Sequence, residues 1–223
     1  MHNMQKTGGI ASLLCATTFI IGFVVFFTLL MPARYGSLAI DSLQHVTFLA
    51  ENKALMYAWN LIIYVAFGGL LVVLAQALHE RLKAGSPAVM QLATSFGLIW
   101  AGLVIASGMV ANIGTAVVLG VHGKDPAQAA SVWLSLSFVV NGLGGGNEIV
   151  GGLWLLLISW AGLRTGGLPR VMNYFGIVVS VSGLTTVVPA LTELGSIFGL
   201  GIIVWFVWLG IFMLRNAIGA RTR

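Results

Sequence analysis

Long uninterrupted runs of apolar residues dominate this chain of 223 residues. A helix needs about 20 mostly apolar residues to cross the roughly 30 Å hydrocarbon core of a bilayer. Six segments reach that length and are predicted as membrane spans: about 9–31, 54–78, 89–119, 144–163, 171–190 and 195–214. The first run is longer than the apolar part of a cleavable signal peptide, so it is expected to remain as a span. The pattern predicts an all-α polytopic transmembrane bundle of six helices, with residues 1–223 forming one integral membrane domain.

Residues 126–163 form the ambiguous stretch of this pattern, because as one helix they would extend about 57 Å. They could hold one span plus an extra helix, or two spans. With six crossings and the N-terminus inside, the lysines and arginines lie on the inner side, 11 in all less the three outside. Those three are Arg34, Lys53 and Lys124. A seventh crossing would move every arginine from Arg164 onward to the outside, against the positive-inside rule. We therefore predict six spans with both termini in the cytoplasm.

Two short helices are expected outside the spans, on the outer side. Asp125 and Pro126 form an N-cap followed by a proline at the first helical position, which predicts a helix to about Gly142. The glycines after it allow a bend before the fourth span. Ser37–Ala50 has an apolar face that includes Leu43 and Val46, with Asp41, Gln44 and His45 opposite, so it is predicted as an amphipathic helix at the interface.

The composition supports lipid as the solvent for most of the surface. The chain is 58% hydrophobic and 8% charged, with a mean hydropathy of +0.99, whereas soluble domains are about a quarter charged. The net charge of +5 does not indicate nucleic-acid binding, because the basic residues are scattered rather than gathered in a patch. The expected partner is the lipid bilayer.

Polar residues within or beside the predicted spans gather in the outer half of the membrane. Counting about 1.5 Å per residue from the span ends places five of them there: Asn60, Asn112, Asn147, Glu148 and Glu193. A carboxylate within a span usually faces protein or a water-filled cavity rather than lipid. These side chains are therefore the candidate ligand-binding residues of an outward-facing pocket.

Glu148 is the central candidate because glycines three and four residues before and after it would form a ridge on its helix face. The alternative is that Glu148 bonds Asn60, Asn112 or the backbone and only holds helices together. Glu193 could equally be solvated at a helix start, where the helix dipole favours a negative charge. Trp59 and Trp133 fall near predicted membrane interfaces, as the residues of aromatic belts do.

No metal site, cofactor or catalytic residue is predicted. Asp41, His45, Glu51 and His122 could be drawn as a metal site on the outer side, but no HExxH or CxxC spacing occurs. GxSxG, P-loop and GxGxxG motifs are absent from the sequence as well.

Two sequence stretches carry a resemblance to a known family. They are Lys-Thr-Gly-Gly-Ile-Ala-Ser-Leu-Leu at 6–14, and Gly-Gly-Leu-Pro-Arg at 166–170 ahead of two closing spans that end in Trp208 and Arg215. The chain resembles a bacterial family of small six-span membrane proteins known only as a domain of unknown function. The resemblance implies a location in the bacterial cytoplasmic membrane and six spans, and it brings no site residues.

The leading hypothesis is a membrane protein whose outward-facing polar pocket binds or transports a small molecule or a cation. The first alternative is a non-catalytic structural or assembly subunit of a membrane complex. The second is an intramembrane metal-dependent enzyme. Glycine-rich helix faces such as Gly195-xxx-Gly199 also suggest a homo-oligomer.

Overall fold

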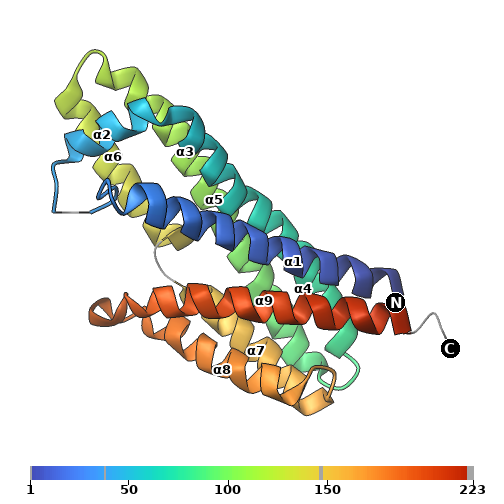
Figure 1. Cartoon of the computed structure of the whole chain (residues 1–223). Helices are drawn as coiled ribbons and strands as arrows, with labels where there is room; N and C mark the ends of the chain where they lie inside the picture. Colours follow the sequence, from blue (N-terminus) through green and yellow to red (C-terminus); the bar gives the residue numbers. More distant parts are fainter. Residues whose placement is uncertain (1, 38, 146–147, 220–223) are drawn as a thin grey trace. The chain divides into compact units, whose positions relative to one another are not determined.

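The computed structural model describes residues 2–37, 39–145 and 148–219, and every regular element in these ranges is helical (Figure 1). The all-α prediction is therefore confirmed. Three π-helical turns, labelled η1, η2 and η3, extend or interrupt the α-helices, and η4 is a short 3-10 turn. In chain order the elements are α1 (His2–Val25), η1 (Phe26–Leu30), α2 (Ser42–Glu51), α3 (Lys53–Asn60), η2 (Leu61–Ala66), α4 (Phe67–Leu82), α5 (Pro87–His122), α6 (Pro126–Val140), η3 (Asn141–Gly145), α7 (Ile149–Thr165), α8 (Arg170–Thr185), η4 (Pro189–Leu191) and α9 (Leu194–Gly219).

Five helical stretches in the described part of the chain are long and apolar enough to cross a membrane. They are Asn3–Leu30, Lys53–Leu82, Pro87–His122, Pro126–Thr165 and Leu194–Ala217. They cover five of the six predicted spans, and the count of six stays a prediction.

The remaining predicted span, 171–190, corresponds to α8, which ends at Thr185. Its 16 residues reach about 24 Å, which is less than the hydrocarbon core. After Thr185 the backbone tightens, because the N–H groups of Thr186 and Val187 donate to carbonyls three residues earlier. Pro189 follows without an N–H group of its own, so an α-helix does not continue through it.

The chain packs as two compact units. The first unit is Met1–Phe19, Phe67–Gly102 and Asn147–Arg223, and the second is Ile20–Ala66 and Leu103–Gly146. Helices α1 and α5 contribute residues to both.

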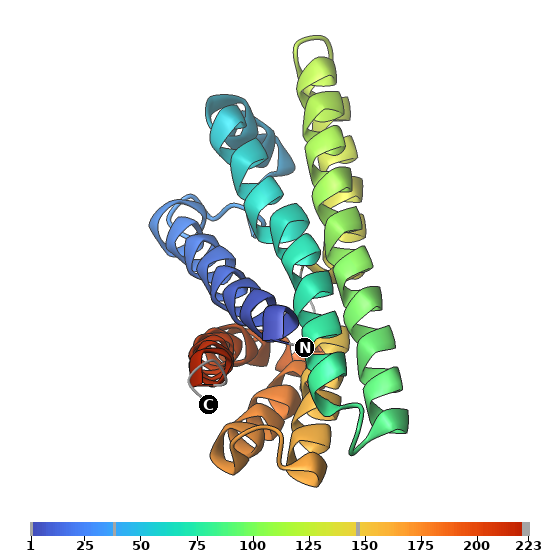
Figure 2. The same cartoon turned by 90° about the vertical axis from the view of Figure 1, so that its right-hand side faces the viewer.

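Close approach between helices organises the first unit, where α7 packs against α8 and α8 against α9 (Figure 2). A Cβ atom on Gly152 of α7 would lie 2.9 Å from the backbone oxygen of Ser180 and 3.0 Å from the backbone nitrogen of Leu184. Large rings also fill the interior of this unit. Trp154 of α7 and Trp205 of α9 are fully buried and meet edge to face at 5.7 Å. Gly152 is thus used for packing inside the chain, and the homo-oligomer stays a prediction.

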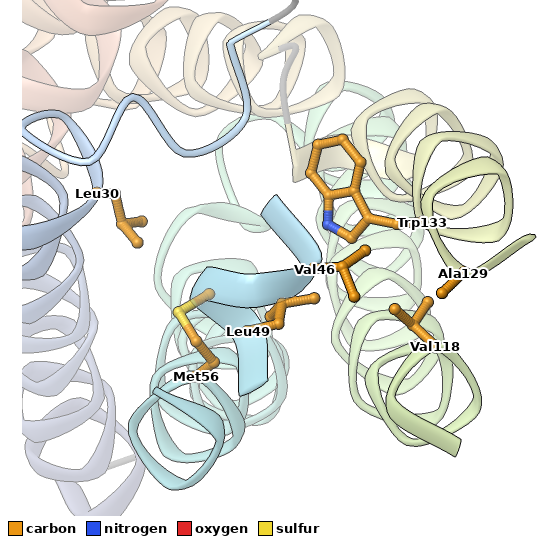
Figure 3. Packing of buried hydrophobic residues seen from close by; sticks show 7 residues of the cluster. All are labelled: Leu30, Val46, Leu49, Met56, Val118, Ala129 and Trp133. Atoms are coloured by element: carbon orange, nitrogen blue, oxygen red, sulfur yellow. The ribbon is translucent and has the colours of Figure 1, made fainter. Parts of the chain in front are cut away.

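Helix α2 organises the second unit by packing against α6. Figure 3 shows the apolar cluster that this contact builds, which consists of Leu30, Val46, Leu49, Met56, Val118, Ala129 and Trp133. Asp41 caps the helix, since its Oδ1 accepts the N–H of Leu43 at 3.2 Å. The expected helix Ser37–Ala50 therefore begins later, at Ser42. His45 was expected on the polar face and is instead 2% exposed.

The connection from α6 to α7 follows the sequence prediction at its start and departs from it at its end. Asp125 caps α6 by accepting the N–H of Gln128 at 2.9 Å, and Pro126 is the first helical residue. The α-helix ends at Val140 and continues into η3, where Gly144 has a φ of +133°. A residue with a side chain rarely adopts this conformation, so the expected bend is located at Gly144.

The predicted span 144–163 would place Glu148 within a helix. In the structure Glu148 does not lie within one. It is the residue before α7, with φ −113° and ψ 23°. The preceding helical stretch already departs from helical geometry at Gly144.

We predict that Gly152→Ala destabilises the protein by about 1–3 kcal/mol, because an added methyl group would meet backbone atoms that no side-chain rotation can move. The measurement is unfolding of the detergent-purified protein by denaturant titration. Gly102→Ala is the control, because a Cβ there meets nothing within 4 Å and its effect should be neutral or stabilising by up to about 1 kcal/mol. Equal effects of the two substitutions would contradict the close α7–α8 approach.

Candidate functional site

A pocket of about 710 Å³ lies in the second unit. Pockets that bind small molecules commonly measure about 300–1,000 Å³. Its wall is formed by η1, the loop that follows η1, and parts of α2, α3, η2, α5, α6 and η3. Apolar and aromatic side chains make up most of the wall, and a few polar groups interrupt it, which is the usual character of a ligand site.

All three π-helical turns contribute to this wall, through Phe26 and Leu30 of η1, Tyr64 of η2 and Asn141 of η3. The wide turn is visible in the hydrogen bonds: the N–H of Met31 donates to the oxygen of Phe26, five residues earlier, at 2.8 Å. Single π-helical turns within α-helices occur frequently at functional sites. Their convergence on one cavity marks it as the candidate site.

Arg34 stands at the pocket with an unusual backbone. Its φ is +51°, in the left-handed region that residues other than glycine rarely occupy. Neighbouring hydrogen bonds impose this conformation: the N–H of Arg34 donates to Met31 and that of Ser37 donates to Arg34, each at 3.0 Å. A non-glycine residue held in this region costs on the order of 1–3 kcal/mol, and such strain tends to cluster at binding sites.

His45 of α2 holds the segment that follows Arg34. The N–H of Gly36 donates to Nδ1 of His45 at 3.4 Å, so Nδ1 is unprotonated and Nε2 carries the proton. Nε2 then donates to the carbonyl oxygen of Ser37 at 3.1 Å. The imidazole ring also stacks on Trp133 at 4.0 Å. One neutral histidine therefore fixes two consecutive backbone groups beside the pocket.

Burial lowers the pKa of His45 below its ordinary value of 6.5, and this effect exceeds the opposing effects of the Ser37 carbonyl and of Asp41. The same aromatic group includes Tyr35, whose hydroxyl accepts the indole N–H of Trp133 at 3.1 Å. Burial raises the pKa of Tyr35 to about 12, against the lowering effect of this hydrogen bond. Both side chains are thus neutral near pH 7.

Two of the predicted site residues meet in this unit. Asn60 is 5% exposed and lines the pocket, and its Nδ2 donates to Oδ1 of Asn112 at 3.1 Å. Asn112 in turn donates to the carbonyl oxygen of Tyr57 at 3.4 Å. Asn60 therefore contributes to the pocket wall, and Asn112 connects α5 to α3 behind it.

The predicted acidic residues belong to the first unit. The backbone N–H of Glu148 donates to Oγ1 of Thr186 at 3.2 Å, and its Cγ lies 4.0 Å from where a Cβ of Gly195 would be. Glu193 is exposed and directly precedes α9. Asn147 lies outside the described residues. A single recess that joins all five predicted residues stays a prediction.

The sequence analysis missed most of the pocket wall. Trp59 and Trp133 were assigned to membrane interfaces, and both line the pocket. Arg34 was counted only as an outer charge. Its position directly after the first apolar run was visible in the sequence, but its left-handed backbone was not.

No protein-family model matches this chain, and no curated protein or solved structure matches it either. The resemblance to the bacterial six-span family therefore stays a prediction.

We predict that stability falls as the pH decreases below 6.5, partly because of His45. Its folded-state pKa is lowered, so the unfolded chain binds more protons below 6.5 and the contribution of the neutral ring is lost as the pH falls towards the folded-state pKa. Above 6.5 this contribution is fully present. The measurement is the thermal unfolding midpoint against pH for the wild type and for His45→Gln.

The His45→Gln variant should lose less stability than the wild type over the acidic range, because its amide does not titrate. Parallel curves for the two proteins would show that folding does not lower the pKa of His45.

Proposed function

We propose that this chain is a multi-pass protein of the bacterial cytoplasmic membrane, with both termini in the cytoplasm, and that its second unit binds a small molecule. Five helical stretches of suitable length and apolarity support the membrane location. The distribution of lysine and arginine supports the orientation. In this orientation the segment 31–37 lies on the outer side, and the pocket beside it is reached from there.

The coincidence of the pocket with strained and widened backbone carries the binding proposal. The pocket of about 710 Å³ is partly open, so a small molecule can enter it. Its walls include three π-helical turns and Arg34 in the left-handed region, and such backbone features tend to cluster at binding sites. Contacts with a ligand would offset part of the backbone strain.

The chemistry of the wall favours a small, mostly apolar molecule over a cation. Arg34 is the one fully charged side chain among the lining residues that the structure describes. A cation would be repelled by its guanidinium group. The proposal is therefore that the pocket binds such a molecule.

A structural or assembly role is the second candidate, and the bond between Asn60 and Asn112 favours it. Intramembrane amide pairs often hold helices together without contacting a ligand. In that role the two asparagines connect α3 to α5, and the pocket is incidental.

We predict that Ala111→Phe abolishes binding of an apolar probe. Ala111 of α5 lines the pocket, so a phenyl ring there occupies space that a ligand needs. The measurement is saturable binding of radiolabelled dodecanol to the bead-captured protein in nanodiscs of zwitterionic lipid. The wild type should bind the probe saturably, and the variant at least about tenfold more weakly, a loss of about 1.4 kcal/mol or more.

Ala116→Phe is the matched control, because Ala116 is on the same helix, is exposed and does not line the pocket. This variant should bind dodecanol as the wild type does. Absence of saturable binding to the wild type, or equal losses in the two variants, would refute the binding proposal.

We predict that Asn60→Leu and Asn112→Leu are energetically coupled, by about 0.6 kcal/mol and at most about 1.7 kcal/mol, as intramembrane hydrogen bonds are. A double-mutant cycle in denaturant titration measures this coupling. Dodecanol affinity separates the two candidate functions, because Asn60 lines the pocket and Asn112 does not. A lower affinity in Asn60→Leu alone supports binding, whereas unchanged affinity in both variants favours the structural role.

A further inference from the structure

The pocket has an excess of positive charge. Arg34 is exposed, and no acidic side chain in the described ranges forms an ion pair with it. The lining residues that the structure describes include no aspartate or glutamate. The guanidinium group presents five N–H donors in a fork that matches a carboxylate.

The remainder of the wall is apolar. Phe26 and Met31 line the pocket and are exposed apolar side chains. Such a surface gains free energy by contact with hydrocarbon, at about 25 cal/mol per Å² of apolar area removed from water. The pocket thus joins a positively charged part to an apolar part.

We infer that the ligand is a single-chain alkyl carboxylate, with its carboxylate at Arg34 and its hydrocarbon chain against the apolar wall. One cation in the wall balances the one charge of a carboxylate, whereas a phosphate monoester carries about −1.5 to −2. This inference rests on the proposed binding function, and it names the class of molecule that the same pocket takes.

The test compares dodecanoate with dodecanol, which share a chain length and differ in charge. Each competes with radiolabelled dodecanol for the protein in zwitterionic nanodiscs, at a pH where the carboxylate is ionised. The wild type should bind dodecanoate about tenfold or more tightly than dodecanol, as expected for a charge-assisted pair. Arg34→Gln should remove this preference, measured as the ratio of the two affinities within the variant.

Two further variants make the test independent of folding defects. Arg34→Gly relieves the left-handed strain, so it should be at least as stable as the wild type and still lack the preference for dodecanoate. Lys124→Gln removes an exposed charge of the same unit outside the pocket and should keep the preference.

Three results would overturn the inference. Equal affinities of the wild type for dodecanoate and dodecanol would show that the pocket does not select a carboxylate, while the proposed binding function would stand. Equal losses of preference in Arg34→Gln and Lys124→Gln would show an unspecific effect of charge. Displacement of dodecanoate by phosphatidylglycerol in the nanodisc would assign the site to a lipid phosphate. Absence of saturable binding of either probe refutes the proposed function itself.

Discussion

The structure depends on one constraint: in apolar surroundings, a backbone N–H or carbonyl group must find its partner within the chain. Helices satisfy this requirement locally, and all regular elements in the described ranges are helical. Hydroxyl groups follow the same rule. Thr17 and Thr28, for example, are on the surface of α1 and η1, and each donates to the carbonyl oxygen four residues earlier. Such groups therefore add little polarity to the surface.

The pocket forms where the chain no longer continues as a helix. After η1 the chain leaves the helix, and local bonds such as that from Arg34 to Met31 satisfy only some of its backbone groups. His45 supplies two further partners from α2, by accepting from Gly36 and donating to Ser37. The apolar contacts of α2 with α6 then keep the ring in place. The segment beside the pocket is thus held by a helix that packs against α6.

Features encoded by short-range chemistry could be predicted from the sequence. The apolar runs identify the long helices, and Asp125 followed by Pro126 identifies the start of α6. The end of α8 was missed because the valines at 187 and 188 are as apolar as a span requires, while the stop comes from the tightened backbone before Pro189. Apolarity measures the preference for lipid, and it does not determine where a helix ends.

The candidate site was harder to predict because it depends on contacts between distant parts of the chain. Asn60 was identified as a polar residue in an apolar run, and the structure places it at the pocket. Arg34 and His45 have ordinary sequence surroundings. Their roles come from a left-handed backbone angle and from a stacking partner 88 positions away, Trp133. Neither of these has a signature in one sequence.

The π-helical turn η2 affects how the rest of its helix is oriented. Each residue of an α-helix adds about 100° of rotation, so a turn that accommodates one extra residue rotates everything after it by that amount. Tyr64 of η2 lines the pocket. Removal of one residue between Leu61 and Tyr64 would therefore turn Tyr64 about the helix axis by roughly a quarter of a revolution, away from the pocket. In this chain, the length of one short segment decides which of its side chains reaches the wall.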